Sequence, residues 1–269
     1  MSRRRLSTAQ VRQLAGELSE RDRAILATVD QLRFVRGLQL ERLHFEGLAE
    51  SSRARRRRDV LNRLTRAQLL TRLERRIGGQ RAGSAGHIYA LGPGGQRLHQ
   101  LQAGQPRRLR HRAEPSLAFL AHTLAVAETY TLIHDAGTEL VTVEVEPDCW
   151  RTVHSGYQTL TLKPDLFTEL AAGNLIYSWF IEIDLGTERR PALRRKAQRY
   201  LDAYHHGFHG QPEGSFPRVL WLVPDTKRAY FLAAALRPIA APDGLFATAV
   251  QPSSPTALTE LLTRAERAA

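Results

Sequence analysis

The sequence has 269 residues, of which 42% are hydrophobic, so it can bury one large core or two smaller ones, and disorder is excluded for most of the chain. Its single cysteine, Cys149, excludes an internal disulfide, and its apolar runs are shorter than the roughly 20 residues that span a bilayer. Because the net charge is +12 and the N-terminus has no apolar signal segment, we expect a cytoplasmic protein with an anionic partner and no membrane association.

The positive charge is concentrated in the first 112 residues. This part holds 25 arginines, no lysine and 9 acidic residues, a balance of +16, whereas the remainder has 14 basic and 18 acidic residues, a balance of −4. Arginine makes up 36 of the 39 cations, and its planar guanidinium suits bidentate contacts with phosphate and guanine. The sequence therefore predicts that the first part binds double-stranded DNA.

The first part begins with three expected helices. Residues 19–35 start with Ser19 as an N-cap, followed by acidic side chains in the first turn and apolar residues at helical spacing. A short helix follows over residues 38–45, and its expected core positions are Leu38, Leu40 and Leu43. A third helix is expected within residues 51–70, where apolar residues share one face and arginines occupy the rest of the surface.

The third helix is the predicted DNA-recognition helix. Five arginines within six residues repel one another unless a polyanion compensates their charge. A solvated arginine helix in a domain that binds protein is the alternative. We expect DNA contacts from this helix and the following hairpin through Arg53, Arg55, Arg56, Arg57, Arg58, Asn62, Arg63 and Arg81.

Two short strands, residues 70–77 and 88–91, are expected to pair as a hairpin whose glycine-rich tip carries Arg81, before a helix that opens near Pro93. Three helices followed by a basic hairpin is the order of a winged helix-turn-helix domain, which places its third helix in the major groove. We therefore predict such a domain over residues 1–101. Residues 102–114 have no periodicity and are basic, which predicts a linker.

Residues 115–269 alternate between helix and strand patterns, which predicts an α/β domain with a mixed sheet and an α+β class for the whole chain. A helix over 116–137 precedes a strand over 139–146, and two strands over 157–170 and 174–186 form a hairpin. The remaining elements are expected as helix, strand, helix, strand and helix over residues 190–208, 218–224, 226–236, 245–250 and 254–269.

Glu182 and Asp184 are two residues apart on the second hairpin strand, so they are expected to share one face, with Asp165 on the preceding strand within reach. Converging carboxylates repel one another unless a divalent cation lies between them, and oxygen ligands with open water positions suit Mg²⁺ or Mn²⁺. Such an ion can activate water for attack on a phosphodiester. The alternative is a structural network in which Glu182 or Asp184 pairs with a cation of the next helix: Arg194, Arg195 or Lys196.

The motif "KPD", the interval of 17 residues from Asp165 to Glu182 and the following "EID" resemble the PD-(D/E)xK nuclease superfamily. The resemblance implies that Asp165 and Glu182 bind the metal, with Glu128 as an accessory carboxylate from the preceding helix. Asp184 occupies the place of the superfamily's lysine, which stabilises charge on the attacking water or the phosphate. An aspartate cannot do so, but Lys196 on the next helix can supply a migrated ammonium. The candidate catalytic residues are therefore Asp165, Glu182, Asp184 and Lys196.

The chain as a whole, through the winged helix and "FIEIDLGTERRPALRRKAQRYLDAY", resembles the replication-relaxation family of plasmid and mobile-element proteins. The resemblance implies a bacterial DNA-binding protein that acts in plasmid replication and DNA relaxation, with a nuclease-like second domain kept for binding. Expected partners are double-stranded DNA, a second copy of the chain and other replication or transfer proteins. Two alternatives stay open: an active nuclease or nickase that depends on Mg²⁺ or Mn²⁺, and a winged-helix transcriptional regulator.

Overall fold

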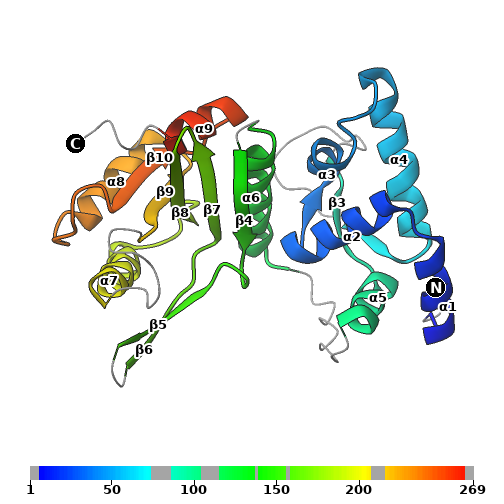
Figure 1. Cartoon of the computed structure of the whole chain (residues 1–269), viewed down its shortest axis with the longest axis horizontal. Coiled ribbons are helices and arrows are strands. Elements are labelled where there is room, and N and C mark those ends of the chain that lie inside the picture. Colours follow the sequence, from blue (N-terminus) through cyan, green and yellow to red (C-terminus); the bar gives the residue numbers. More distant parts are fainter. Residues whose placement is uncertain are drawn as a thin grey trace. The chain divides into compact units, whose positions relative to one another are not determined.

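The computed structural model describes residues 6–73, 86–103, 115–136, 139–155, 158–206 and 216–263 (Figure 1). The chain divides into two compact units, Met1–Thr131 and Leu132–Ala269. The division lies in helix α6 (Leu117–His134), later than the expected linker at 102–114, because Leu120 and Leu124 of α6 pack with Ile88 of the first unit. Within the described part of the chain, no helix is both long enough and apolar enough to cross a membrane.

The first unit contains the expected helices and the expected pairing of two strands. Its strands form an antiparallel sheet in the order β1-β3-β2, in which β2 and β3 are the predicted pair. The bounds are α1 (Thr8–Glu17), α2 (Glu20–Leu32), β1 (Val35–Arg36), α3 (Gly37–His44), α4 (Glu50–Arg66), β2 (Leu70–Leu73), β3 (Ile88–Leu91) and α5 (Pro93–Ala103). Residues 74–85, which include the predicted hairpin tip and Arg81, lie outside the described residues.

Capping residues set where the first two helices begin. In α2, the Ser19 hydroxyl accepts a hydrogen bond from the Asp22 amide at 3.2 Å, and the Asp22 carboxylate accepts one from the Ser19 amide at 3.0 Å. The expected N-cap at Ser19 is therefore confirmed. The helix α1 uses Ser7 in the same way, but it escapes a search for apolar periodicity because its buried side consists of Val11 alone.

The inner side of α3 differs from the expected one. Leu40 is buried, but Leu38 is 46% exposed, whereas Gln39 is buried. The Gln39 side-chain oxygen accepts a hydrogen bond from the Arg36 amide at 2.8 Å, which holds Gln39 against the start of the helix and toward the interior. The expectation that Leu38 is a core position is wrong, because a polar capping side chain occupies that side of the helix.

The second unit is built on a mixed sheet of five strands in the order β10-β9-β8-β7-β4. The pairs β4/β7 and β7/β8 are antiparallel, and the pairs β8/β9 and β9/β10 are parallel. The mixed sheet predicted for this part of the chain is confirmed. The strand bounds are β4 (Glu139–Val145), β7 (Leu166–Ala172), β8 (Leu175–Ile183), β9 (Arg218–Val223) and β10 (Phe246–Val250).

The strand expected over residues 157–170 is divided in two. Its first half, β6 (Gln158–Leu162), pairs with β5 (Arg151–Ser155) in a separate hairpin, and its second half is β7. Pro164 lies at the break, and because proline has no amide hydrogen it cannot continue a ladder of strand hydrogen bonds. The break places Asp165 at the start of β7 rather than inside a strand, which shapes the carboxylate cluster described below.

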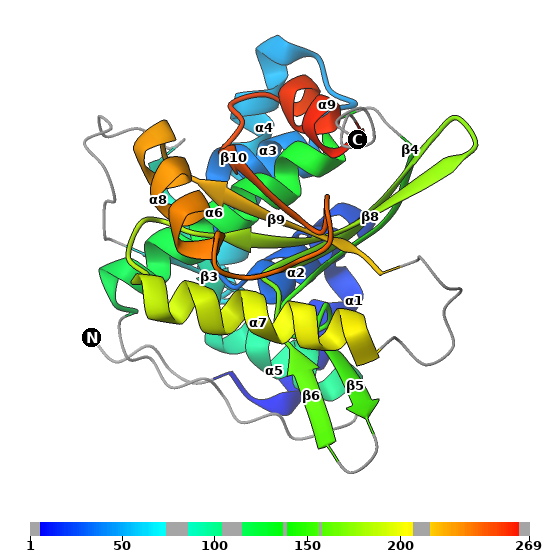
Figure 2. The same cartoon turned by 90° about the vertical axis from the view of Figure 1, so that its left-hand side faces the viewer.

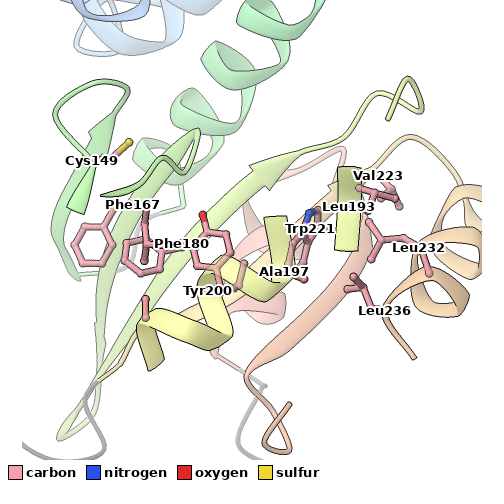
Figure 3. Packing of buried hydrophobic residues seen from close by; sticks show 14 of the residues in the cluster. Cys149, Phe167, Phe180, Leu193, Ala197, Tyr200, Trp221, Val223, Leu232 and Leu236 are labelled. Carbon is pink, nitrogen blue, oxygen red and sulfur yellow. The ribbon is translucent and has the colours of Figure 1, made fainter. Parts of the chain in front are cut away.

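Helices cover both faces of this sheet. On one face lie α7 (Arg190–His206) and α8 (Thr226–Leu236), which contact each other and are both in the foreground of Figure 2. Figure 3 shows the Tyr200 ring of α7 between the rings of Phe180 and Trp221, at centroid distances of 5.7 and 6.2 Å. On the other face, the Trp179 indole donates a hydrogen bond to the Leu262 carbonyl of α9 (Pro255–Thr263) at 3.0 Å. The core is therefore formed in two layers.

Candidate functional site

The carboxylate cluster lies where β8 ends and the chain turns toward α7. Side chains alternate along a strand, so Phe180 and Glu182 face α7 while Trp179 faces α9. Glu182 is 1% exposed in a layer that is otherwise apolar. A carboxylate in such a place needs partners within the protein, because water cannot solvate it there.

Glu182 finds both partners on α7. Lys196 Nζ donates to Glu182 Oε2 at 2.7 Å, and the Tyr200 hydroxyl donates to Oε1 at 2.6 Å. The two donors are four residues apart, which places them on the same face of a helix. Burial raises the pKa of Glu182 to about 7; the Lys196 ammonium opposes this rise, and nearby Asp165 adds to it.

Lys196 connects the buried carboxylate with the surface. Its ammonium also lies 3.6 Å from Glu188 Oε1, and 31% of its side chain is exposed. Burial alone lowers the pKa of Lys196, but the carboxylates of Glu182, Asp165 and Glu188 outweigh that effect and raise it. Lys196 therefore stays charged and neutralises the cluster. Burial likewise raises the pKa of Tyr200, which keeps its hydroxyl protonated as a donor.

Asp165 joins the cluster from the start of β7. Its carboxylate accepts a hydrogen bond from the Ile183 amide at 2.7 Å, and its own amide donates to the Ile181 carbonyl at 3.1 Å. Asp165 thus continues the pairing of β7 with β8 by one residue before Leu166, the first residue of β7. Its influence on the pKa values of Glu182 and Lys196 places all three groups within electrostatic reach of one another.

Asp184 follows the strand and pairs with α8 instead of α7. Arg228 donates from Nε to Asp184 Oδ2 at 2.8 Å and from Nη2 to Oδ1 at 3.1 Å, a bidentate pair. The same Nη2 donates to the Glu188 carbonyl at 2.6 Å. The Gly186 amide donates to Asp184 Oδ1 at 2.7 Å, in a turn where the φ of Gly186 is +86°, a value that favours glycine.

The structure brings Asp165, Glu182 and Lys196 together, whereas Asp184 pairs with Arg228 of α8 and Glu128 has other partners. The Glu128 carboxylate accepts hydrogen bonds from Gln39 at 2.7 Å and from Arg42 at 2.6 Å, both on α3 of the first unit. The role expected for Glu128, an accessory metal ligand beside Asp165, has no support in this geometry because both of its oxygens hold α3 against α6.

The donors of the cluster do not fit Mg²⁺ or Mn²⁺, which need several oxygen ligands with free lone pairs. The oxygens of Glu182 and Asp184 already accept from the cations Lys196 and Arg228, and one oxygen of Asp165 accepts a backbone amide. In the ranges that the structure describes, no group of three or more His, Cys, Asp and Glu side chains could hold a metal ion. No metal-assisted step follows from this arrangement.

The other candidate surface is the outward side of α4. Arg55, Arg58, Asn62 and Arg66 are exposed and follow one another at intervals of three and four residues, so they form a stripe along the helix. We call these four residues the α4 stripe. The buried residues of the opposite side include Val60, Leu61 and Leu64. The apolar face predicted for this helix is confirmed, and Arg56 is exposed beside the stripe.

Three predicted DNA-binding arginines of α4 have partners elsewhere in the first unit, and a fourth, Arg55, lies 4.0 Å from the exposed carboxylate of Asp59 on α4 itself. Arg57 is 3% exposed and its Nη1 lies 2.8 Å from a carboxylate oxygen of Glu41, so it cannot reach a duplex while this pair holds. Arg63 donates to Asp22 at 2.6 Å, and Arg53 donates to two carbonyls of the loop before α4. Burial alone raises the pKa of Asp22, but hydrogen bonds from Ser19 and Arg63 outweigh it and lower it.

The candidate site residues expected from the sequence did not include Tyr200, Arg66 or Arg228. Tyr200 is four residues after Lys196 and Arg66 is four residues after Asn62, so helical spacing points to both. Arg228 is 44 residues from Asp184, and nothing local to the motif predicts that contact.

A family model described as replication-relaxation matches residues 26–219. The match includes α4 and the segment from Asp165 to Lys196, and it ends before Arg228. No curated protein and no solved structure matches the chain.

Proposed function

The chain belongs to the replication-relaxation family, and from this premise we propose that it binds double-stranded DNA during replication or relaxation of a plasmid or mobile element. The α4 stripe is the observation that carries the proposal. The first unit, residues 1–131, holds 25 arginines and 11 acidic residues, a balance of +14. Such an excess favours a polyanion, because each phosphate neutralised by arginine releases a counterion.

We ascribe a winged helix-turn-helix fold to the first unit. The order α2, α3, α4 and then the β2 to β3 pair supports it, with α4 as the helix that enters the major groove. The stripe from Arg55 to Arg66 extends for about 16 Å at ~1.5 Å per residue, which compares with a major groove about 12 Å wide. Its ends therefore reach the two phosphate walls of the groove, and Asn62 lies between them, where a base edge is within reach.

We ascribe a nuclease-like fold to the second unit, retained for assembly or binding and not for cleavage. The hairpin β7 to β8 with its three acidic residues and the following basic helix supports the likeness. The partners of the carboxylates support the loss of cleavage, because Lys196 and Arg228 hold the oxygens that a divalent ion would need. In this reading the charges of the cluster stabilise the fold.

The proposal is tested by fluorescence anisotropy of a labelled DNA duplex with the full chain. The variant Arg55→Ala/Arg58→Ala/Arg66→Ala should lower the slope of log K against log salt by about 3 units, since each lost phosphate contact removes about 0.9. Arg12→Ala, which removes an exposed charge from α1, is the matched control and should leave the slope nearly unchanged. An unaltered slope in the triple variant would remove α4 as the DNA-contacting helix.

A further inference from the structure

The helix α7 is basic, whereas the rest of its unit is acidic. It contains five cations and one carboxylate, a balance of +4. The remaining residues of 132–269 contain nine cations and fifteen carboxylates, a balance of −6. Within the second unit, net positive charge therefore lies on α7.

The arginines of α7 lie on its solvent side. Leu193, Ala197 and Tyr200 are buried against the sheet. Arg195 and Arg199 are four residues apart on the opposite, exposed side, and Arg190 and Arg194 are a second exposed pair at the same spacing. Like charges at this spacing destabilise a helix by about 0.2–0.5 kcal/mol per pair.

The partners of these arginines carry no negative charge. Arg194 Nε donates to the Ala235 carbonyl at 2.8 Å, and Arg199 donates to the Thr161 carbonyl of β6 at 2.5 Å. The Arg190 guanidinium lies 5.1 Å from the centre of the Phe231 ring. Among the described residues, no ion pair with a carboxylate involves Arg190, Arg194, Arg195 or Arg199. The contacts orient the guanidinium groups and leave their charge uncompensated.

This situation differs from that of Lys196 on the same helix. Lys196 turns inward and its charge is balanced by Glu182. The arginines form an exposed row on α7, which contacts α8 and the hairpin of β5 and β6. A row of exposed guanidinium groups with free donors matches the repeated phosphates of a nucleic acid strand.

We propose that the outward side of α7 is a second DNA-contacting surface, which binds the phosphate backbone independently of α4. The inference goes beyond the function proposed above, which places DNA contact on α4 and does not say what the second unit binds. Phosphate contacts of this kind carry no base specificity. The chain then holds two DNA surfaces, and binding by one raises the effective concentration of DNA at the other.

The test compares the full chain with Arg195→Ala/Arg199→Ala by anisotropy of a labelled duplex over about 50 to 200 mM salt. The pair is introduced both into the unaltered chain and into the variant that lacks the α4 arginines. We expect about tenfold weaker binding and a salt slope lower by about 2 units in both backgrounds. The control Arg195→Lys/Arg199→Lys keeps the charge and should keep the slope. If the alanine pair lowers the melting temperature, Arg195→Gln/Arg199→Gln repeats the comparison with neutral side chains that keep more of the length of arginine.

An unchanged slope in both backgrounds would overturn the inference. Loss of all binding on removal of the α4 arginines alone would also overturn it, since α7 should then still hold DNA at low salt. The result that α7 variants weaken binding while α4 variants do not would refute the function proposed for α4 and leave the α7 surface in place.

Discussion

The α4 stripe and the carboxylate cluster at the end of β8 are both dense groups of charge, but they differ in what neutralises them. The arginines of the stripe are exposed, whereas Glu182 and Asp184 are 1% and 4% exposed and hold cations of their own chain. A buried ion pair contributes to the stability of the fold, and removing one member leaves the other charge buried without a partner. Charge that is exposed is available to a ligand, and the ion pair of Arg55 with Asp59 is 4.0 Å long and open to solvent. Sequence alone makes the two groups look equally functional.

The largest effect that separates the two regions is expected from Arg228→Ala. The variant strands Asp184, which is nearly fully buried and loses two hydrogen bonds, so we expect a loss of about 4 kcal/mol in the free energy of unfolding. Lys227→Ala, next to it and exposed, should cost less than about 0.5 kcal/mol. Urea unfolding followed by tryptophan fluorescence measures both, because all 3 tryptophans lie in the second unit. Equal stabilities for the two variants would show that the Asp184 pair is dispensable.

A somewhat smaller loss is expected from Lys196→Ala. The variant removes the charge that balances Glu182, but the carboxyl can take up a proton because its pKa is about 7, so we expect a loss of about 3 kcal/mol at neutral pH. The control Gln198→Ala breaks only an exposed hydrogen bond to Asp202 on the same helix. If instead Lys196 serves catalysis and not stability, Lys196→Ala should unfold at the same urea concentration as the control.

Substitution of two neighbouring arginines of α4 should affect different properties, stability in one case and DNA binding in the other. Arg57→Ala removes the cation that lies beside Glu41, whose side chain is only 17% exposed. We therefore expect a loss of about 2 kcal/mol in the free energy of unfolding. Arg58→Ala should leave stability within about 0.5 kcal/mol but weaken binding to duplex DNA. Thermal unfolding by circular dichroism and anisotropy are measured on the same samples. The comparison fails if Arg57→Ala is stable and binds DNA more weakly than Arg58→Ala.

The smallest of these expected effects is the change in stability with pH. The pKa of Glu182 is about 7 in the folded protein against an ordinary value of 4.5, so the folded state binds the proton more tightly. Protonation therefore stabilises the fold, and this contribution is lost as the pH rises from 4.5 through 7. Relative to Glu182→Gln, which does not titrate there, the unaltered chain should lose on the order of 1 kcal/mol between about pH 6 and about pH 7.5. Parallel pH profiles would contradict this coupling.

Much of the fold follows from local signals. The α8 helix and the β7 to β8 hairpin were predictable because a run of apolar residues and a glycine turn mark them, and Gly173 has a φ of +61°. The β5 strand was not, because residues 151–155 lack a strong alternation and depend on β6 for their pairing. Leu38 was misplaced because Gln39, a polar side chain, takes the inner position on α3.

The candidate site was less predictable than the fold. Side chains alternate along a strand, so Glu182 and Asp184 point to the side of the sheet that α7 and α8 cover. Asp165 lies in the loop before β7 and accepts a hydrogen bond from the Ile183 amide, between these two residues. The sequence cannot reveal that Arg228 lies against Asp184, because the contact depends on how α8 packs on the sheet. Without that contact, an acidic cluster resembles a metal site.

We predict that the protein binds DNA without cutting it, and supercoiled plasmid tests this most directly. The full chain is incubated with plasmid and Mg²⁺ or Mn²⁺, and each sample is divided before electrophoresis. The native half should show a mobility shift that Arg55→Ala/Arg58→Ala/Arg66→Ala weakens without abolishing it. The half freed of protein should contain supercoiled plasmid only. Conversion to nicked or linear DNA that disappears in Asp165→Ala would contradict the account, because the carboxylates would then be catalytic.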